Sequence, residues 1–157
     1  SDSPRYRKLT QRIVVPVIRR NKIEPYSADQ MYQLVNDVAS YPKFLPWCRN
    51  SRVEIETERM MQASILMAKG PLNKWFTTKN QLIPGERIEM ALVKGPFKHL
   101  RGIWEFKDRP EGGSEIFCNI DFDFAFGPAK LVLTPIFESI ASSMIVAFSE
   151  RAKVIYG

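Results

Sequence analysis

Histidine and cysteine are scarce in this sequence, which has one histidine, His99, and two cysteines, Cys48 and Cys118, among 157 residues. These residues show no C-x-x-C or H-x-x-x-H spacing, so we expect neither a structural nor a catalytic zinc site. Two cysteines with no recognisable secretory signal before them do not make a disulfide framework. We therefore expect a reducing compartment and no metal.

Long apolar runs are also missing, since no stretch approaches the roughly 18 residues that a membrane-spanning helix needs. The longest run near the start, Ile13 to Ile18, contains Pro16. Any membrane contact is therefore expected to be peripheral. Internal repeats and low-complexity tracts are not visible either. With 45% hydrophobic and 11% aromatic residues, the composition is that of one globular domain with a sizeable core.

Basic residues are unevenly distributed along the chain, although the formal net charge is +6. Residues 1–22 contain seven basic residues against Asp2 alone, whereas residues 23–157 contain sixteen residues of each sign. We therefore predict a basic N-terminal arm, residues 1–22, a neutral folded domain, residues 23–157, and no DNA partner. The arm fits anionic lipid, RNA or the remnant of a cleaved targeting sequence, and the alternative is a solvated end. A start at Ser1 rather than Met favours processing or truncation.

Helical spacing occurs near both ends of the predicted domain. Ser27 followed by Gln30 has the spacing of a capping box, which predicts a short helix behind it. A second short helix is expected with Pro42 in its first turn and Pro46 at its end. A long helix is predicted from about Pro135 to Tyr156, with Pro135 starting or kinking its regular part. Its apolar stripe is Leu133, Ile136, Phe137, Ile140, Met144 and Phe148, opposite Glu138, Ser142, Ser149 and Lys153.

Between these helices the apolar residues alternate with polar ones, which is typical of half-buried strands. The clearest strand, Ile116 to Phe126, has Asn119, Asp121 and Asp123 on its polar face. Turns rich in glycine and proline separate the strands. The pattern predicts an antiparallel meander, and the long helix should close its concave face.

Several short segments together resemble the START-like family, a helix-grip group in the polyketide cyclase superfamily that includes coenzyme Q-binding proteins and bacterial ribosome-association toxins. The similarity covers roughly residues 25–157 and is poorest at residues 107–115. The segments that carry it are residues 25–32, 36–38, 41–42, 44–48, 76–78, 84–88, 95–100 and 147–152, with Trp104 and Phe106. The resemblance implies an α+β helix-grip fold, in which a curved antiparallel sheet wraps a long C-terminal helix and two short helices follow the first strand.

The resemblance implies two functions. Trp47-Cys48 resembles the quinone-binding branch, whereas Lys69-Gly70 and Gly95-Pro96-Phe97 are equally similar to bacterial members. The first function is a coenzyme Q (ubiquinone) carrier or chaperone that supports respiratory electron transfer or quinone biosynthesis. Its partners would be ubiquinone or a similar isoprenoid lipid and a peripheral membrane surface, in mitochondria (inner membrane, matrix side) or in bacteria (cytoplasm or inner-membrane surface). The alternative is a ribosome-associated inhibitor of subunit joining, which the basic arm would assist through phosphate contacts.

A lipid carrier of this fold needs an apolar cavity between sheet and helix, with an expected volume of roughly 300–1,000 Å³. Burying some 300 Å² of ligand there would contribute about 7 kcal/mol before ordering costs. Core packing is the alternative for each residue, and Phe44, Leu45 and Trp47 could instead form a cavity mouth or a rim that touches a membrane. The candidate ligand-binding residues are Phe44, Leu45, Trp47, Met67, Trp75, Met90, Trp104, Phe122, Phe124, Ile136, Phe137, Ile140 and Met144.

An enzymatic role, such as that of a polyketide cyclase, is the weakest prediction. A nucleophile such as Cys48 or Ser143 needs a positioned base, and His99 has no visible partner in the sequence. Asp121 and Asp123 fall on the face opposite the phenylalanine row, where we expect them to be solvated. Binding without catalysis, and without a catalytic cofactor, is therefore the expectation.

Overall fold

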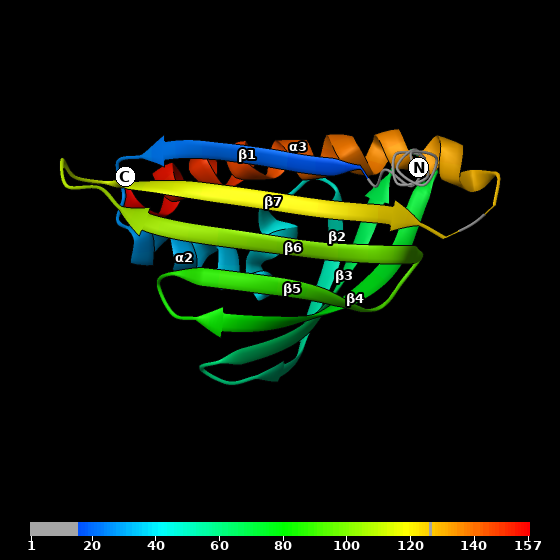
Figure 1. Ribbon diagram of the computed structural model, residues 1–157, viewed down its shortest axis with the longest axis horizontal. Coiled ribbons are helices and arrows are strands. Elements are labelled where there is room, and N and C mark those ends of the chain that lie inside the picture. The colour runs from blue at the N-terminus through cyan, green and yellow to red at the C-terminus, as the bar shows by residue number, and fades with distance from the viewer. Residues whose placement is uncertain (1–15, 126) are drawn as a thin grey trace, which may run out of the picture.

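The computed structural model describes residues 16–125 and 127–157, in which a seven-stranded antiparallel sheet curves around a long helix (Figure 1). The elements are β1 (Val17–Glu24), α2 (Ala28–Asn36), the 3-10 helix η1 (Val38–Lys43), β2 (Cys48–Glu56), β3 (Met60–Lys69), β4 (Leu72–Ile83), β5 (Arg87–Lys94), β6 (Phe97–Asp108), β7 (Ser114–Phe124) and α3 (Ala129–Tyr156). Strands β2 to β7 form a meander, and β1 adds to β7 at the edge. The predicted α+β helix-grip fold is confirmed.

Irregularities in strand pairing accompany the curvature of the sheet. The register shifts between Val53 and Ile55 in β2, between Thr77 and Thr78 in β4, and between Phe97 and His99 in β6. Each such bulge bends its strand and increases the local twist. The result is a concave face on which α3 and the short helices pack.

The two short helices differ in type. In α2 the predicted capping box is confirmed, since the Gln30 amide donates to Ser27 Oγ (3.1 Å) and the Ser27 amide donates to Gln30 Oε1 (2.9 Å). The second helix is a 3-10 helix, and Pro42 lies in its last turn rather than in its first. Pro42 has no N–H to donate to the Ala39 carbonyl, and the helix ends one residue later at Lys43.

Strand β7 starts two residues earlier than predicted because of the turn before it. The Arg109 amide donates to the Gly113 carbonyl (3.0 Å), and pairing with β6 begins at Asp108 and Ser114. Gly113 has φ +70°, and a Cβ at this position would lie 2.1 Å from the Glu24 carbonyl oxygen. Only glycine fits such a close approach to β1. Phe126, predicted as the end of this strand, lies outside the described residues.

The predicted boundary at residue 22 is wrong, because β1 begins at Val17. Residues 17–22 pair with β7, and Ile18 is buried on the inner face of the sheet, opposite Ile120 of β7. The basic residues Arg19, Arg20 and Lys22 therefore belong to the folded domain. Residues 1–15 of the predicted arm lie outside the described residues.

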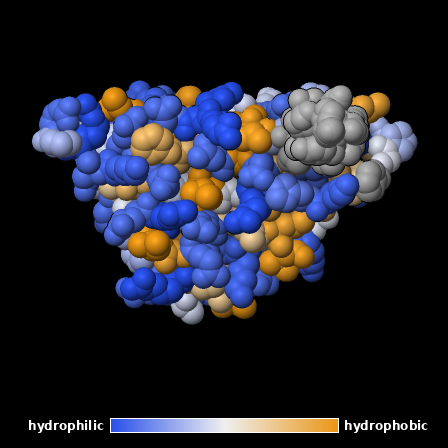
Figure 2. All heavy atoms as spheres, viewed as in Figure 1, coloured by the Kyte–Doolittle hydropathy of each residue, from blue (hydrophilic) through white to orange (hydrophobic). Residues whose placement is uncertain are grey.

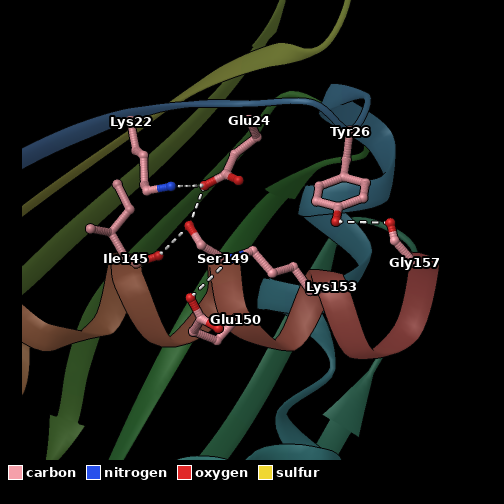
Figure 3. A network of polar contacts seen from close by, with 8 residues as sticks. All are labelled: Lys22, Glu24, Tyr26, Ile145, Ser149, Glu150, Lys153 and Gly157. Atoms are coloured by element: carbon pink, nitrogen blue, oxygen red, sulfur yellow. Dashed lines mark hydrogen bonds and ion pairs between the residues drawn. The ribbon is translucent and has the colours of Figure 1, made fainter.

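Polar contacts attach β1 to α3 (Figure 3). Glu24, only 2% exposed, accepts a hydrogen bond from the Ser149 hydroxyl and forms an ion pair with Lys22 (3.5 Å). Ser149, which the helical pattern placed on the side opposite the apolar stripe, is therefore buried, because a carboxylate on the neighbouring strand gives its hydroxyl a partner. Arg20 also donates to Ser142 (3.2 Å). Side-chain hydrogen bonds thus hold β1 against α3.

Helix α3 begins at Ala129, six residues before the predicted start, with Pro135 inside it. Pro135 cannot donate to the Leu131 carbonyl, and nearby the Thr134 hydroxyl donates to the Lys130 carbonyl (2.8 Å). The helix is long and apolar enough to cross a membrane by length and composition alone, a test that core helices also pass. Its predicted stripe residues Phe137, Ile140 and Phe148 are buried against the sheet.

Candidate functional site

The candidate site is a small apolar cavity between the concave face of the sheet and the helices η1 and α3. Its volume is about 50 Å³, which is room for a few water molecules. The residues that line it are Val38, Tyr41, Trp47, Ala63, Ile65, Phe76, Thr78, Asn80, Met90, Leu100, Ile120, Phe137, Ile140 and Met144. The expectation of a cavity of 300–1,000 Å³ is therefore wrong for this conformation.

Aromatic side chains explain why the cavity is small. Toward the start of α3, Phe137 packs against Phe122 (ring centroids 4.6 Å apart) and Phe97 (5.0 Å). Toward the other end of the helix, Phe148 packs against Trp104 (5.4 Å) and Tyr41 (5.5 Å). These two clusters fill most of the space between helix and sheet and leave only the middle open.

The predicted binding residues fall into three groups. Trp47, Met90, Phe137, Ile140 and Met144 line the cavity. A second group, Leu45, Met67, Trp104, Phe122 and Phe124, is buried in the surrounding core without lining it. The third group lies elsewhere: Ile136 is partly buried near Gly70, and Phe44 lies beneath the Arg151 guanidinium (4.9 Å) and lines a groove beside α2.

The prediction that Trp75 lines the cavity is wrong. Trp75 pairs with Leu66 across the strands, whereas the cavity residues Phe76 and Ile65 pair with each other. Because side chains alternate along a strand, Trp75 points to the outer face. There it stacks under the guanidinium of Arg52, 4.4 Å from the ring centroid. Figure 2 shows that the face of the molecule turned toward the viewer is mostly hydrophilic, with small separate apolar patches.

Polar groups inside the cavity were not predicted from the sequence. Thr78 and Asn80 are 6% and 5% exposed, and the Thr78 hydroxyl donates to Asn80 Oδ1 (2.9 Å). The Tyr41 hydroxyl donates to the Val35 carbonyl, and burial raises the pKa of Tyr41 far above its usual value. Period-two alternation starting from Phe76 would have placed Thr78 and Asn80 on the inner face.

A surface groove lies between the loop that precedes β2, the end of β3 and helix α3. Its volume is about 610 Å³, and it is lined by Pro46, Trp47, Ala68, Lys69, Ser143, Val146 and Ala147. Trp47 lines both this groove and the inner cavity. Trp47 is therefore a wall shared by the two spaces.

The candidate nucleophiles have no base beside them among the contacts of the described residues. Cys48 Sγ donates to the Asn50 carbonyl (3.4 Å), and Ser143 Oγ donates to the Ile140 carbonyl (2.8 Å). Burial raises the pKa of Cys48 to about 11 and that of Cys118 to about 12. Both thiols are therefore protonated at neutral pH and unreactive.

His99 does have a partner, contrary to the prediction from the sequence. Its Nε2 contacts the Asp121 carboxylate on the neighbouring strand β7. Asp123 is also paired, with Lys130 (2.8 Å), so neither carboxylate is simply solvated. The His99–Asp121 pair lies on the outer face of the sheet, because its neighbour Leu100 lines the cavity on the inner face. It therefore cannot act as a base inside the cavity.

Lysines gather at the end of the sheet where the β3–β4 and β5–β6 turns meet the start of α3. Lys69 and Lys74 flank the first turn, Lys94 and Lys98 flank the second, and Lys130 lies in the first turn of α3. We call these five residues the cationic end. Exposed apolar side chains lie beside them, namely Leu131 (83% exposed), Val132 and Val93. The combination offers positive charge and apolar surface together.

A curved sheet that wraps around one long helix, with an apolar interior between the two, defines a START-like helix-grip protein. The chain belongs to the family described as "Polyketide cyclase / dehydrase and lipid transport", which matches residues 25–149. It is 46% identical to the ribosome association toxin RatA of Pseudomonas aeruginosa, over 89% of this chain and 97% of the relative.

The chain is also similar, more distantly, to a coenzyme Q-binding protein and to an aromatase/cyclase. The chain is 28% identical to the mitochondrial coenzyme Q-binding protein COQ10 homolog B of Xenopus laevis, over 87% of this chain and 58% of that protein. Among solved structures it resembles the Zhui aromatase/cyclase of Streptomyces sp. R1128, with a TM-score of 0.79, 14% identity, and coverage of 89% of this chain and 94% of that chain. At this identity, the structural similarity shows the fold alone.

Proposed function

We propose that this protein associates with ribosomes and inhibits the joining of their subunits, without catalysing a reaction. The observation that carries the proposal is the 46% identity to the ribosome association toxin of P. aeruginosa, which extends over 97% of that protein. The small interior cavity, about 50 Å³ in this conformation, is compatible with this proposal. Surface contacts, rather than a bound small molecule, would then carry the function.

The cationic end is the surface that we propose for this contact. Its lysines can neutralise phosphates of ribosomal RNA, and release of the condensed counterions then favours binding. Lys74 and Lys94 are both exposed there. The opposite end of the molecule carries the C-terminus and the β6–β7 turn (Figure 1).

Reversal of charge at the cationic end tests this proposal. The double variant Lys74→Glu/Lys94→Glu is expected to lose most cosedimentation with purified bacterial ribosomes. The plot of log affinity against log salt concentration should also become shallower, by the amount that corresponds to about two lost phosphate contacts. The variant should also stop preventing the assembly of small and large subunits. The matched control is Arg109→Glu/Lys153→Glu, which changes the net charge equally at the other end. Equal loss in both double variants would contradict a specific contact.

A second function, binding of ubiquinone or a similar isoprenoid lipid, is favoured by a specific observation. The apolar cavity and the groove of about 610 Å³ are adjacent and share Trp47 as a wall. Similarity to the coenzyme Q-binding protein of X. laevis supports the same ligand class. Such binding requires the interior to open, since the closed cavity is too small for a quinone ring.

Copurification tests the second function. We expect native mass spectrometry of the purified full chain to show a fraction with added mass that organic extraction removes and that chromatography identifies as a quinone. A chain that copurifies with no lipid, and that remains ligand-free after incubation with ubiquinone, would exclude this function. It would leave the ribosome proposal unaffected.

A further inference from the structure

Trp47 lines both the inner cavity and the surface groove. On the cavity side it lies with Met144 of α3, and on the groove side it lies with Ser143, Val146 and Ala147 of the same helix turn. Neither space serves an amphipathic ligand alone: the cavity holds about 50 Å³, and the groove, although it measures about 610 Å³, is open at the surface. A change in the indole position would join the two spaces.

The indole N–H of Trp47 is a buried donor without an acceptor. The side chain is only 7% exposed, and Nε1 has no hydrogen-bond partner within residues 16–125 and 127–157. The backbone around it is well bonded, since the Ala68 amide donates to the Trp47 carbonyl (2.8 Å) and the Cys48 amide donates to the Leu45 carbonyl (2.9 Å). An unpaired buried donor costs free energy, and buried polar groups in proteins are nearly always paired.

We propose that Trp47 is both the gate and the hydrogen-bond donor of a site for an amphipathic ligand with a carbonyl head and an apolar tail. The inference rests on the lipid-binding function proposed above. Rotation of the indole joins the groove to the cavity, and its N–H then donates to the carbonyl oxygen of the ligand. The apolar tail then lies in the joined space, between Val146 and Ala147 of the groove and Met144 of the cavity. This arrangement gives the unpaired donor its acceptor and accounts for its position between the two spaces.

Substitution of Trp47 by phenylalanine tests the donor role, because it removes the N–H and keeps most of the apolar volume. The probes are ubiquinone with two isoprene units and geranylbenzene, which has the same tail and no carbonyl. By calorimetry, Trp47→Phe is expected to bind the quinone about tenfold more weakly than wild type does and to lose the preference for quinone over geranylbenzene. The melting temperature without ligand should stay the same or rise, because an unpaired buried donor has been removed.

Two further variants test the gate. Val146→Trp places a large side chain in the groove at a position that is 52% exposed, so the chain should fold and lose quinone binding. Val154→Trp, at an exposed position near the end of α3, is its matched control and should bind as wild type does. Trp75→Phe, on the outer face, is the control for removal of an indole and should also leave binding unchanged.

The outcomes separate this inference from the function on which it rests. If wild type binds ubiquinone and Trp47→Phe binds it equally well, the donor role is refuted and lipid binding stands. If Trp47→Phe melts at a lower temperature and loses binding only in proportion to its unfolding, Trp47 is a packing residue and the inference fails. If wild type binds neither probe, both the inference and the lipid-binding function fail.

Discussion

Met144→Lys is expected to lower the free energy of unfolding by about 3–5 kcal/mol, because it places an unpaired ammonium in a closed apolar interior. Met144 is 9% exposed, and the residues that line the cavity beside it include no carboxylate. A lysine there has no room to extend its charged end to water inside a cavity of about 50 Å³. Since small domains have a total stability of roughly 5–15 kcal/mol, the variant should melt well below the wild type.

The control for this prediction is Val146→Lys on the same helix. Val146 is 52% exposed, so its ammonium stays hydrated and the melting temperature should change little. The pH dependence gives a second check. Burial lowers the pKa of the new lysine in the folded state, so the stability of Met144→Lys should rise as the pH approaches the ordinary lysine pKa of about 10.4. A Met144→Lys protein that melts like Val146→Lys at neutral pH would show that the cavity opens far more readily than the closed structure implies.

The fold could be predicted from the sequence because its signals are local. The Ser27–Gln30 capping box and the alternation from Ile116 to Phe124 depend only on neighbouring residues, and both are present in the structure. The family resemblance then ordered these elements into a helix-grip fold. Errors in the element boundaries arose where tertiary contacts decide them. Val17, for example, belongs to a strand because β7 pairs with it, and no local motif marks that position.

The site was harder to predict because it depends on strand faces and on rotamers. Trp75 and Phe76 are adjacent aromatic residues, and only the pairing with β3 decides which of them faces the cavity. The contact between His99 and Asp121 likewise requires the register of β6 against β7. The cavity volume depends on how Phe97, Phe122 and Phe137 interlock, and composition carries no information about that packing. Residue type therefore predicted an apolar interior correctly but not its volume.

Deletion of residues 1–22 is expected to unfold the domain or to make it aggregate, whereas deletion of residues 1–15 should leave it folded. The longer deletion removes Val17 to Lys22, six of the eight residues of β1, and with them the buried side chain of Ile18. Loss of a buried isoleucine side chain alone costs about 2–5 kcal/mol. The deletion also removes Lys22, the ion-pair partner of buried Glu24, and leaves β7 as an unprotected edge.

The two deletions separate the structural role of β1 from the charge of the segment before it. Residues 1–15 contain Arg5, Arg7, Lys8 and Arg12 against Asp2, so their removal lowers the net charge by three. If this charge contributes to ribosome binding, the shorter deletion should weaken cosedimentation at low salt and have little effect at high salt, where the Debye length falls to about 3 Å at 1 M. Its melting temperature should match that of the full chain. A marked fall in that temperature would show that residues 1–15 stabilise the domain, and unchanged binding at every salt concentration would leave Lys74 and Lys94 as the cations to be tested for the contact.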